Sequence, residues 1–150
     1  MMDIIKELQG GFISRSADDT EAAGEALARA LAPDMTLALS GELGTGKTTF
    51  VKGLARGWGI RKSITSPTFN LYTLYDGDRR LIHFDAYRLD SPEAAEDLLI
   101  EDFLQSPYCL VVEWPEKVAD WLPSPRMNLS FAIVGKNRHA IRLSRLFEGQ

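Results

Sequence analysis

The chain carries two short apolar runs of the kind found in strands that are buried inside a parallel sheet. The first covers residues 35–40, and the second covers residues 109–113, where the apolar pattern ends in an acid. Apolar residues also recur with helical spacing over residues 20–32 and again from Phe50 onward. This alternation of strands and helices predicts an α/β fold with parallel strands at its centre.

Antiparallel hairpins are expected at the edges of this sheet. Two pairs of segments have strand propensity on either side of a turn: residues 69–75 with 81–85, and residues 128–134 with 140–146. Asp76-Gly77-Asp78 is a strong turn signal in the first pair. Residues 12–14 form one further short edge strand. The fold class is therefore a three-layer α/β sheet with antiparallel hairpins at its edges.

Capping signals mark where some helices begin. Ser16-Ala17-Asp18-Asp19 resembles a capping box, with Asp19 in place of the usual glutamate. Ser91 precedes Pro92 at the start of a short acidic helix predicted over residues 92–99. About one helical turn is expected at residues 118–122. No repeat or linker interrupts the chain, so residues 1–150 are expected to form a single domain.

Composition excludes some classes of function. The chain has 150 residues, 45% of them hydrophobic and 25% charged, with a net charge of −4. Basic residues occur only in isolation or as pairs, which makes the chain a poor candidate to hold RNA or DNA by itself. No apolar run approaches the length of a membrane span. The single cysteine, Cys109, cannot form an internal disulfide, and a buried thiol in a cytoplasmic protein is expected.

Residues 41–49 fit the phosphate-binding loop pattern G-x-x-x-x-G-K-[ST] without a mismatch. They are, in order, Gly41, Glu42, Leu43, Gly44, Thr45, Gly46, Lys47, Thr48 and Thr49. A strand precedes the loop and a helix follows it, which is the frame that this motif requires. Backbone N–H groups and the helix dipole favour a phosphate at this place. Lys47 is expected to contact the β- and γ-phosphates and the Thr48 hydroxyl to ligate Mg²⁺, so the sequence predicts a P-loop NTPase-like domain.

Two acids follow apolar strands and are candidates for the second half of such a site. Asp85 ends the run 81–84, and Glu113 ends the run 109–112. The carboxyl ends of parallel strands open onto the phosphate site, where an acid holds the metal shell or orients the attacking water. Asp85 and Glu113 are therefore candidate catalytic and metal-binding residues together with Lys47. The sequence does not divide these roles between the two acids.

Other polar and aromatic residues near these motifs have weaker signals. Thr68, in an extended loop before Phe69, is a candidate sensor of the γ-phosphate. His83 alternates with apolar neighbours along a strand, so a structural histidine is expected. Arg88 is a candidate either for neutralising phosphate charge or for pairing with a nearby acid. Trp114 is expected to be aromatic packing in preference to a contact at the nucleotide's edge.

Four segments together resemble one family, TsaE (also called YjeE), the small ATPase component of bacterial tRNA threonylcarbamoyladenosine synthesis. These segments are Gly41–Thr49, Ser66–Phe69, His83–Leu89 and Val112–Glu116. The resemblance implies ATP with Mg²⁺ as ligand and weak ATPase activity that is coupled to the partner proteins TsaB and TsaD. The partners would hold the tRNA, in agreement with the acidic net charge. The chain departs from the family pattern at Leu99, where glycine is expected.

The resemblance also assigns candidate roles. Thr48 and Glu113 would hold the metal, Asp85 would lie near the Mg²⁺ or water shell, and Lys117 and Arg138 would be candidates for contact with ATP. We expect a nucleotide-controlled switch that turns over slowly alone and faster when a partner completes the site.

Three alternatives differ in what they require. A small-molecule kinase needs an acceptor pocket and a basic lid, for which 150 residues leave little room. A guanine-nucleotide switch needs D-x-x-G and N-K-x-D, which the sequence lacks. A nucleotide-sensing module that never hydrolyses ATP needs the same binding loop, and the two acids argue against it only moderately.

Overall fold

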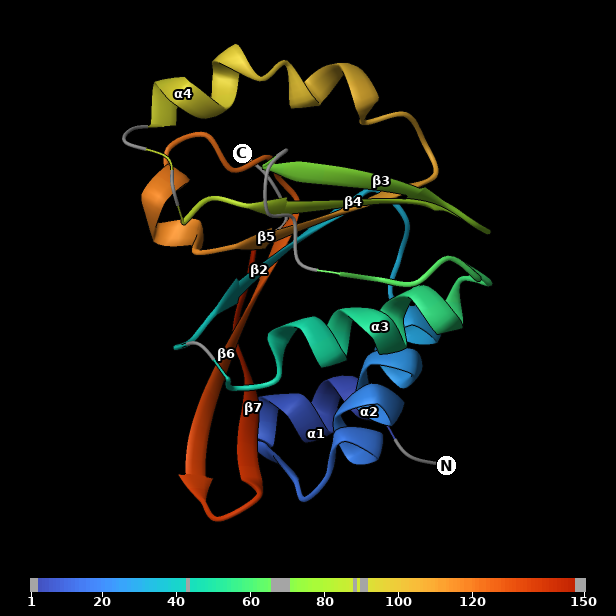
Figure 1. The fold of residues 1–150 in the computed structure, drawn as a ribbon, viewed down its shortest axis with the longest axis vertical. Helices are drawn as coiled ribbons and strands as arrows, with labels where there is room; N and C mark the ends of the chain where they lie inside the picture. The colour runs from blue at the N-terminus through green and yellow to red at the C-terminus, as the bar shows by residue number, and fades with distance from the viewer. Residues whose placement is uncertain (1–2, 43, 66–70, 88, 90–91, 148–150) are drawn as a thin grey trace.

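A mixed sheet of seven strands forms the middle layer of this computed structural model, which describes residues 3–42, 44–65, 71–87, 89 and 92–147. The strand order is β1-β7-β6-β2-β5-β4-β3 (Figure 1). The strands are β1 (Phe12–Ser14), β2 (Met35–Ser40), β3 (Tyr72–Asp76), β4 (Arg80–Asp85), β5 (Tyr108–Glu113), β6 (Arg126–Gly135) and β7 (Arg138–Phe147). β4, β5, β2 and β6 are parallel, whereas β3, β7 and β1 pair antiparallel at the two edges. The predicted sheet is confirmed.

Helices cover both faces of this sheet, which gives the predicted three layers (Figure 1). One face carries three helices: α1 (Ile4–Gly10), α2 (Ala17–Ala30) and α3 (Lys47–Gly57). The other face carries α4 (Pro92–Asp97) and two 3₁₀ helices, η1 (Ile100–Phe103) and η2 (Pro115–Val118). Each layer buries its own apolar cluster, because alternate residues of β4 and β5 point to opposite faces. The strands at the centre are therefore apolar on both sides, as their sequences indicate.

Two glycines allow α2 and α3 to pack backbone against backbone. A Cβ atom on Gly24 would lie 2.2 Å from the carbonyl oxygen of Phe50, and one on Gly53 would lie 2.0 Å from that of Glu21. No side chain larger than hydrogen fits at such distances. This close approach fixes the position of α3, whose first residues belong to the phosphate-binding loop.

The structure confirms the cap of α2 and corrects the bounds of several elements. The Ser16 hydroxyl accepts a hydrogen bond from the backbone N–H of Asp19 at 3.0 Å, so α2 begins at Ala17, directly after the predicted cap, and it ends at Ala30 although the periodic stretch continues to residue 32. The acidic helix α4 ends at Asp97. The turn expected at 118–122 is instead a 3₁₀ helix that begins at Pro115. Helix α1 was not predicted, because only Ile4 and Leu8 mark its buried side.

Leu99 stands where the family pattern predicts glycine, and its backbone has a conformation that favours glycine. Leu99 has φ 55° and ψ 35°, a left-handed conformation that glycine adopts without steric cost.

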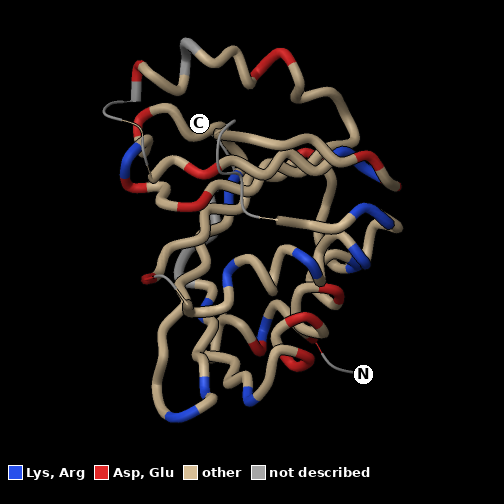
Figure 2. Tube along the Cα trace, in the orientation of Figure 1, with Lys and Arg blue, Asp and Glu red and all other residues tan. Residues whose placement is uncertain are grey.

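Cys109 is buried as expected, and burial raises the pKa of its thiol. Within the described ranges, no helix combines the length and the apolar character needed to cross a bilayer. Figure 2 shows acids along the segment of α4 and η1, and lysine and arginine at several separate places that include the β6–β7 turn.

Candidate nucleotide-binding site

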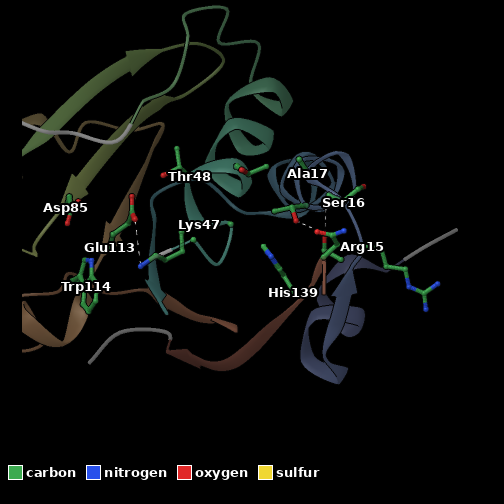
Figure 3. Close-up of a pocket in the computed structure, with 15 residues that line it drawn as sticks. Arg15, Ser16, Ala17, Lys47, Thr48, Asp85, Glu113, Trp114 and His139 are labelled. Carbon is green, nitrogen blue, oxygen red and sulfur yellow. Dashed lines mark hydrogen bonds and ion pairs between the residues drawn. The ribbon is translucent and has the colours of Figure 1, made fainter. Parts of the chain in front are cut away.

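A pocket of about 590 Å³ opens at the carboxyl ends of β4 and β5, beside the phosphate-binding loop (Figure 3). Five segments of the chain contribute to its walls. The residues are Ser14, Arg15, Ser16, Ala17 and Thr20; Gly44, Gly46, Lys47, Thr48 and Thr49; Asp85; Glu113 and Trp114; and Asn137 and His139. The motif and both strand-end acids, which lie far apart in sequence, therefore face one cavity.

The loop follows a path that requires glycine at two points. Gly41 has φ 145°, and a Cβ atom there would lie 2.5 Å from the carbonyl oxygen of Phe131. Gly46 has φ 99° and is the N-cap residue of α3, where it has no side chain that could cap the helix. The Thr45 hydroxyl closes the loop by donating to the carbonyl oxygen of Glu42 at 2.7 Å. Gly46, Lys47, Thr48 and Thr49 line the pocket, so the start of α3 faces it, as an anion-binding helix terminus must.

Lys47 is buried, with 5% of its surface exposed, and three groups surround its ammonium. Nζ donates a hydrogen bond to the carbonyl oxygen of Gly41. It lies 4.0 Å from Oε1 of Glu113 and 4.7 Å from the centre of the Trp114 ring. Figure 3 shows the lysine extending from the loop toward Glu113 and Trp114. A phosphate group would be a stronger acceptor for this ammonium than a single carbonyl oxygen.

Asp85 and Glu113 are neighbours because they occupy paired positions at the ends of two parallel strands. Partial burial raises the pKa of the Asp85 carboxyl, and the negative charge of Glu113 raises it further. The backbone N–H of Tyr87, which donates to Oδ1 of Asp85 at 2.9 Å, acts in the opposite direction. Two carboxylates side by side therefore form a site whose ionised state a cation would stabilise.

The oxygen-bearing side chains at this site suit a Mg²⁺ ion that is bound together with a nucleotide better than a metal ion that is held by protein side chains alone. Mg²⁺ is usually bound through one or two carboxylates, water and the phosphates of a nucleotide. Asp85, Glu113 and the hydroxyl-bearing Thr48 line the same pocket. Within the described part of the chain, no group of three or more His, Cys, Asp or Glu side chains forms a complete metal cage. The residues present thus fit a metal that arrives with its nucleotide.

Two residues have more specific surroundings than the sequence indicated. His83 is fully buried, and its Nε2 lies 2.6 Å from Oε2 of Glu113, so it contacts a candidate site acid. Trp114 was expected to be aromatic packing in preference to a contact at the nucleotide's edge, and it lines the pocket and contacts Lys47. Its backbone is left-handed, with φ 59°, at the point where β5 gives way to η2. This unusual conformation turns the ring toward the loop, and no local sequence signal specifies it.

One wall of the pocket was missed by the sequence analysis. It consists of Ser14 and Ser16 at the β1–α2 junction, Thr20 in α2, and Asn137 and His139 in the β6–β7 hairpin. Antiparallel pairing of β1 with β7 places Ser14 opposite His139. The Ser14 hydroxyl contacts the carbonyl oxygen of Ser16 at 2.8 Å and Oγ1 of Thr20 at 2.6 Å. In Figure 3 the His139 ring projects between Lys47 and the start of α2, whereas the Arg15 side chain points away.

Other candidates lie at the margin of the site or outside the described residues. Lys117 and Arg138 are exposed and do not line the pocket. Nζ of Lys117 lies 5.8 Å from the centre of the Tyr87 ring, and Arg138 lies next to the pocket residues Asn137 and His139 in sequence. Leu43, Thr68 and Arg88 lie outside the described residues.

Comparison with known proteins is consistent with this arrangement. Residues 14–141 match the model of the family described as "Threonylcarbamoyl adenosine biosynthesis protein TsaE". The chain is 39% identical to the tRNA threonylcarbamoyladenosine biosynthesis protein TsaE of Treponema pallidum, over 88% of this chain and 98% of that protein. It is 34% identical to the protein of the same name from Bacillus subtilis, over 83% of this chain and 78% of the relative.

A solved structure has the same fold. The crystal structure of YdiB from Bacillus subtilis superposes with a TM-score of 0.67 at 33% sequence identity, over 87% of this chain and 81% of that chain. The family match begins at Ser14 and ends at Ile141, so it includes the phosphate-binding loop, both acids and the wall formed by β1, α2 and the β6–β7 hairpin. The chain belongs to the TsaE family.

Proposed function

We propose that this chain binds ATP with Mg²⁺ and hydrolyses it as one component of the machinery that forms threonylcarbamoyladenosine in tRNA. The observation that carries the proposal is the meeting of Lys47, Asp85 and Glu113 in one pocket at the start of α3. The relatives' names refer to tRNA threonylcarbamoyladenosine biosynthesis, which supports the pathway. We take residues 1–150 to be a single ATPase domain.

The loop of residues 41–49 would hold the phosphates. Its backbone N–H groups and the first turn of α3 would donate to phosphate oxygens, with help from the helix dipole. Lys47 would exchange its bond with the Gly41 carbonyl for the β- and γ-phosphates, which lie within reach of a side chain on this loop. Thr49 lines the pocket one residue further along α3.

The metal would be held by Thr48 and Glu113, with Asp85 beside the metal or the attacking water. When bound, Mg²⁺ neutralises charge on the β- and γ-phosphate oxygens. Glu113 is 5% exposed and Asp85 is half-buried, so Asp85 is the acid that solvent reaches more easily. This difference favours Glu113 as metal ligand and Asp85 as the residue that orients water.

The wall formed by β1, α2 and the β6–β7 hairpin would receive the nucleoside. His139 offers a planar ring for stacking, and Ser16 and Asn137 offer polar groups for a base or ribose. Ser14 donates a hydrogen bond to the carbonyl oxygen of Ser16, and a second hydrogen bond joins its hydroxyl to that of Thr20, so both bonds hold this wall in place. Arg138 and Lys117 are candidates for contact with ATP from the margin of the pocket.

Turnover by the isolated chain is expected to be slow. Arg15 is the one arginine that lines the pocket among the described residues, and its side chain points away from the cavity. An arginine aimed at the γ-phosphate accelerates related reactions by about 10³–10⁵-fold, and a partner can supply it. We infer that TsaB-like and TsaD-like partners complete the site and hold the tRNA, and that Thr68 senses the γ-phosphate in a nucleotide-controlled switch.

The test is phosphate release from ATP and from GTP with Mg²⁺, measured with and without TsaB and TsaD. Slow ATP hydrolysis that rises with the partners, with GTP a poor substitute, supports the proposal. Glu113→Gln should lower hydrolysis while ATP binding measured in EDTA is retained, which separates an ATPase from a module that only senses nucleotide. ATP turnover that is indifferent to the partners would refute the assembly role.

A further inference from the structure

A buried histidine touches the back of the proposed metal site. His83 has no exposed surface, and it lies on the face of β4 that α1–α3 cover. Its Nε2 is 2.6 Å from Oε2 of Glu113. Because an ionised carboxylate has no hydrogen to give, Nε2 carries the hydrogen of this bond. Within the described part of the chain, Nδ1 is buried and has no hydrogen-bond partner.

The strand register explains why the two side chains meet. His83 pairs with Val111, two residues before Glu113, so His83 and Glu113 are diagonal neighbours on one face of parallel strands. Both carboxylate oxygens of Glu113 have a neighbour: Oε2 is hydrogen-bonded to His83, and Oε1 faces Nζ of Lys47 at 4.0 Å. That second distance is longer than a direct charge-assisted hydrogen bond of about 2.7–2.9 Å. The carboxylate thus approaches the lysine without binding it closely.

We propose that His83 is a positioning residue for Glu113. Its Nε2–H holds one carboxylate oxygen, so that the other remains turned toward the pocket and Glu113 does not collapse onto Lys47. Without this donor, Glu113 would contain a buried acceptor with no partner, and Lys47 would be the donor available to it. A direct Lys47–Glu113 pair would withdraw the ammonium from the phosphates and the carboxylate from the metal. This inference rests on the proposed function, because it assigns a role within the same site.

The first experiment examines the hydrogen bond in the protein without nucleotide. Nitrogen NMR of ¹⁵N-histidine-labelled protein distinguishes which imidazole nitrogen carries hydrogen. The chain has two histidines, and a His139→Gln variant assigns the signals. We expect His83 to be the Nε2–H tautomer with a slowly exchanging proton, and Glu113→Ala to abolish that slow exchange. A His83 ring protonated at Nδ1 alone, or an Nε2 proton that exchanges equally fast with and without Glu113, would overturn the proposal.

The second experiment measures the increment that Mg²⁺ adds to ATP affinity, as the ratio of dissociation constants in EDTA and in Mg²⁺. His83→Leu removes the donor at similar volume, and the ratio should fall roughly 10- to 100-fold, the usual effect of losing a partner that orients a metal ligand. His83→Gln, whose side-chain amide can donate from a place near Nε2, should restore most of the increment. Equal losses in both variants would overturn the proposal, since any buried substitution would then suffice.

Ile82→Ala is the matched control for loss of stability. Ile82 is the preceding residue of β4, is fully buried, and packs in the cluster on the opposite face. The variant should melt at a lower temperature yet keep the wild-type Mg²⁺ increment. A fall in that increment as large as the one caused by His83→Leu would refute the positioning role. If wild-type protein binds no ATP, the proposed function fails, while the NMR experiment still decides whether His83 holds Glu113.

Discussion

Replacing Gly53 by alanine tests the backbone contact that locates the phosphate-binding loop. The new Cβ atom would lie 2.0 Å from the carbonyl oxygen of Glu21 and 2.9 Å from the amide nitrogen of Glu25. Ordinary contact begins at 3.4 Å, so α2 and α3 must separate by about 1.4 Å along this direction. Because both obstructing atoms belong to a helix backbone, no rotamer change relieves the clash. The substitution must therefore shift one helix against the other.

The expected change in the free energy of unfolding of Gly53→Ala follows from two opposing effects. Overpacking costs about 1–3 kcal/mol, and the upper end applies when backbone has to move. Alanine returns about 1 kcal/mol through its higher helix propensity. We therefore expect the free energy of unfolding to fall by about 2 kcal/mol and the melting temperature to fall by about 4–8 °C for a chain of this size. ATP affinity should fall as well, because α3 begins at Lys47.

Thermal unfolding followed by circular dichroism measures the first effect, and calorimetric titration with ATP measures the second. Gly10→Ala is the control, because Gly10 ends α1 and a Cβ atom there meets no other atom within 4 Å. This control should melt at or slightly above the wild-type temperature. A Gly53→Ala protein that is as stable as wild type would show that α2 and α3 do not pack at the distance described.

Three further substitutions probe the site and its surroundings. Lys47→Met should weaken ATP binding roughly 10- to 150-fold, the equivalent of about 1.5–3 kcal/mol for a charged hydrogen bond, in calorimetric titration; unchanged affinity would contradict the assignment. Asp85→Asn should raise the melting temperature of metal-free protein at neutral pH. The folded state holds the pKa of Asp85 above its ordinary value of 3.8, so ionisation costs stability as pH rises, and the gain should vanish below that value. Leu99→Gly should raise the free energy of unfolding by up to about 1 kcal/mol in urea titration, because it relieves a left-handed leucine that is 59% exposed. A loss of stability there would refute this account of the departure from the family pattern.

The centre of the fold was predictable because its signals are local. The apolar run at residues 35–40 corresponds to β2, and the glycine and lysine spacing places a turn and a helix directly after it. Asp85 and Glu113 follow apolar runs, and parallel pairing then brings the two acids together. In each case a pattern within about ten residues, combined with a general rule for parallel sheets, was sufficient.

The remaining features depend on contacts between distant parts of the chain. Ser14 and His139 face the same pocket only because β1 pairs with β7, and neither strand carries a motif that specifies this partner. Trp114 turns toward Lys47 through a left-handed backbone that its residue type does not favour. Helix α1 spans 7 residues, too few to show a helical period clearly. Pairing, strain and short elements are decided by the folded context and not by the local pattern.

The pairing of β1 with β7 also makes the complete site depend on a contact between distant parts of the chain. The wall formed by β1, α2 and the β6–β7 hairpin contains both Ser14 and His139. The complete cavity therefore requires an early and a late segment of the polypeptide to meet. Contacts between such remote segments pay a large loop-closure entropy and tend to form late in folding. The loop of residues 41–49 would thus form before the wall that we propose receives the nucleoside. A ligand that touched both would join the two halves of the cavity and stabilise the finished fold by mass action. Nucleotide affinity would then depend on whether β1 and β7 have paired.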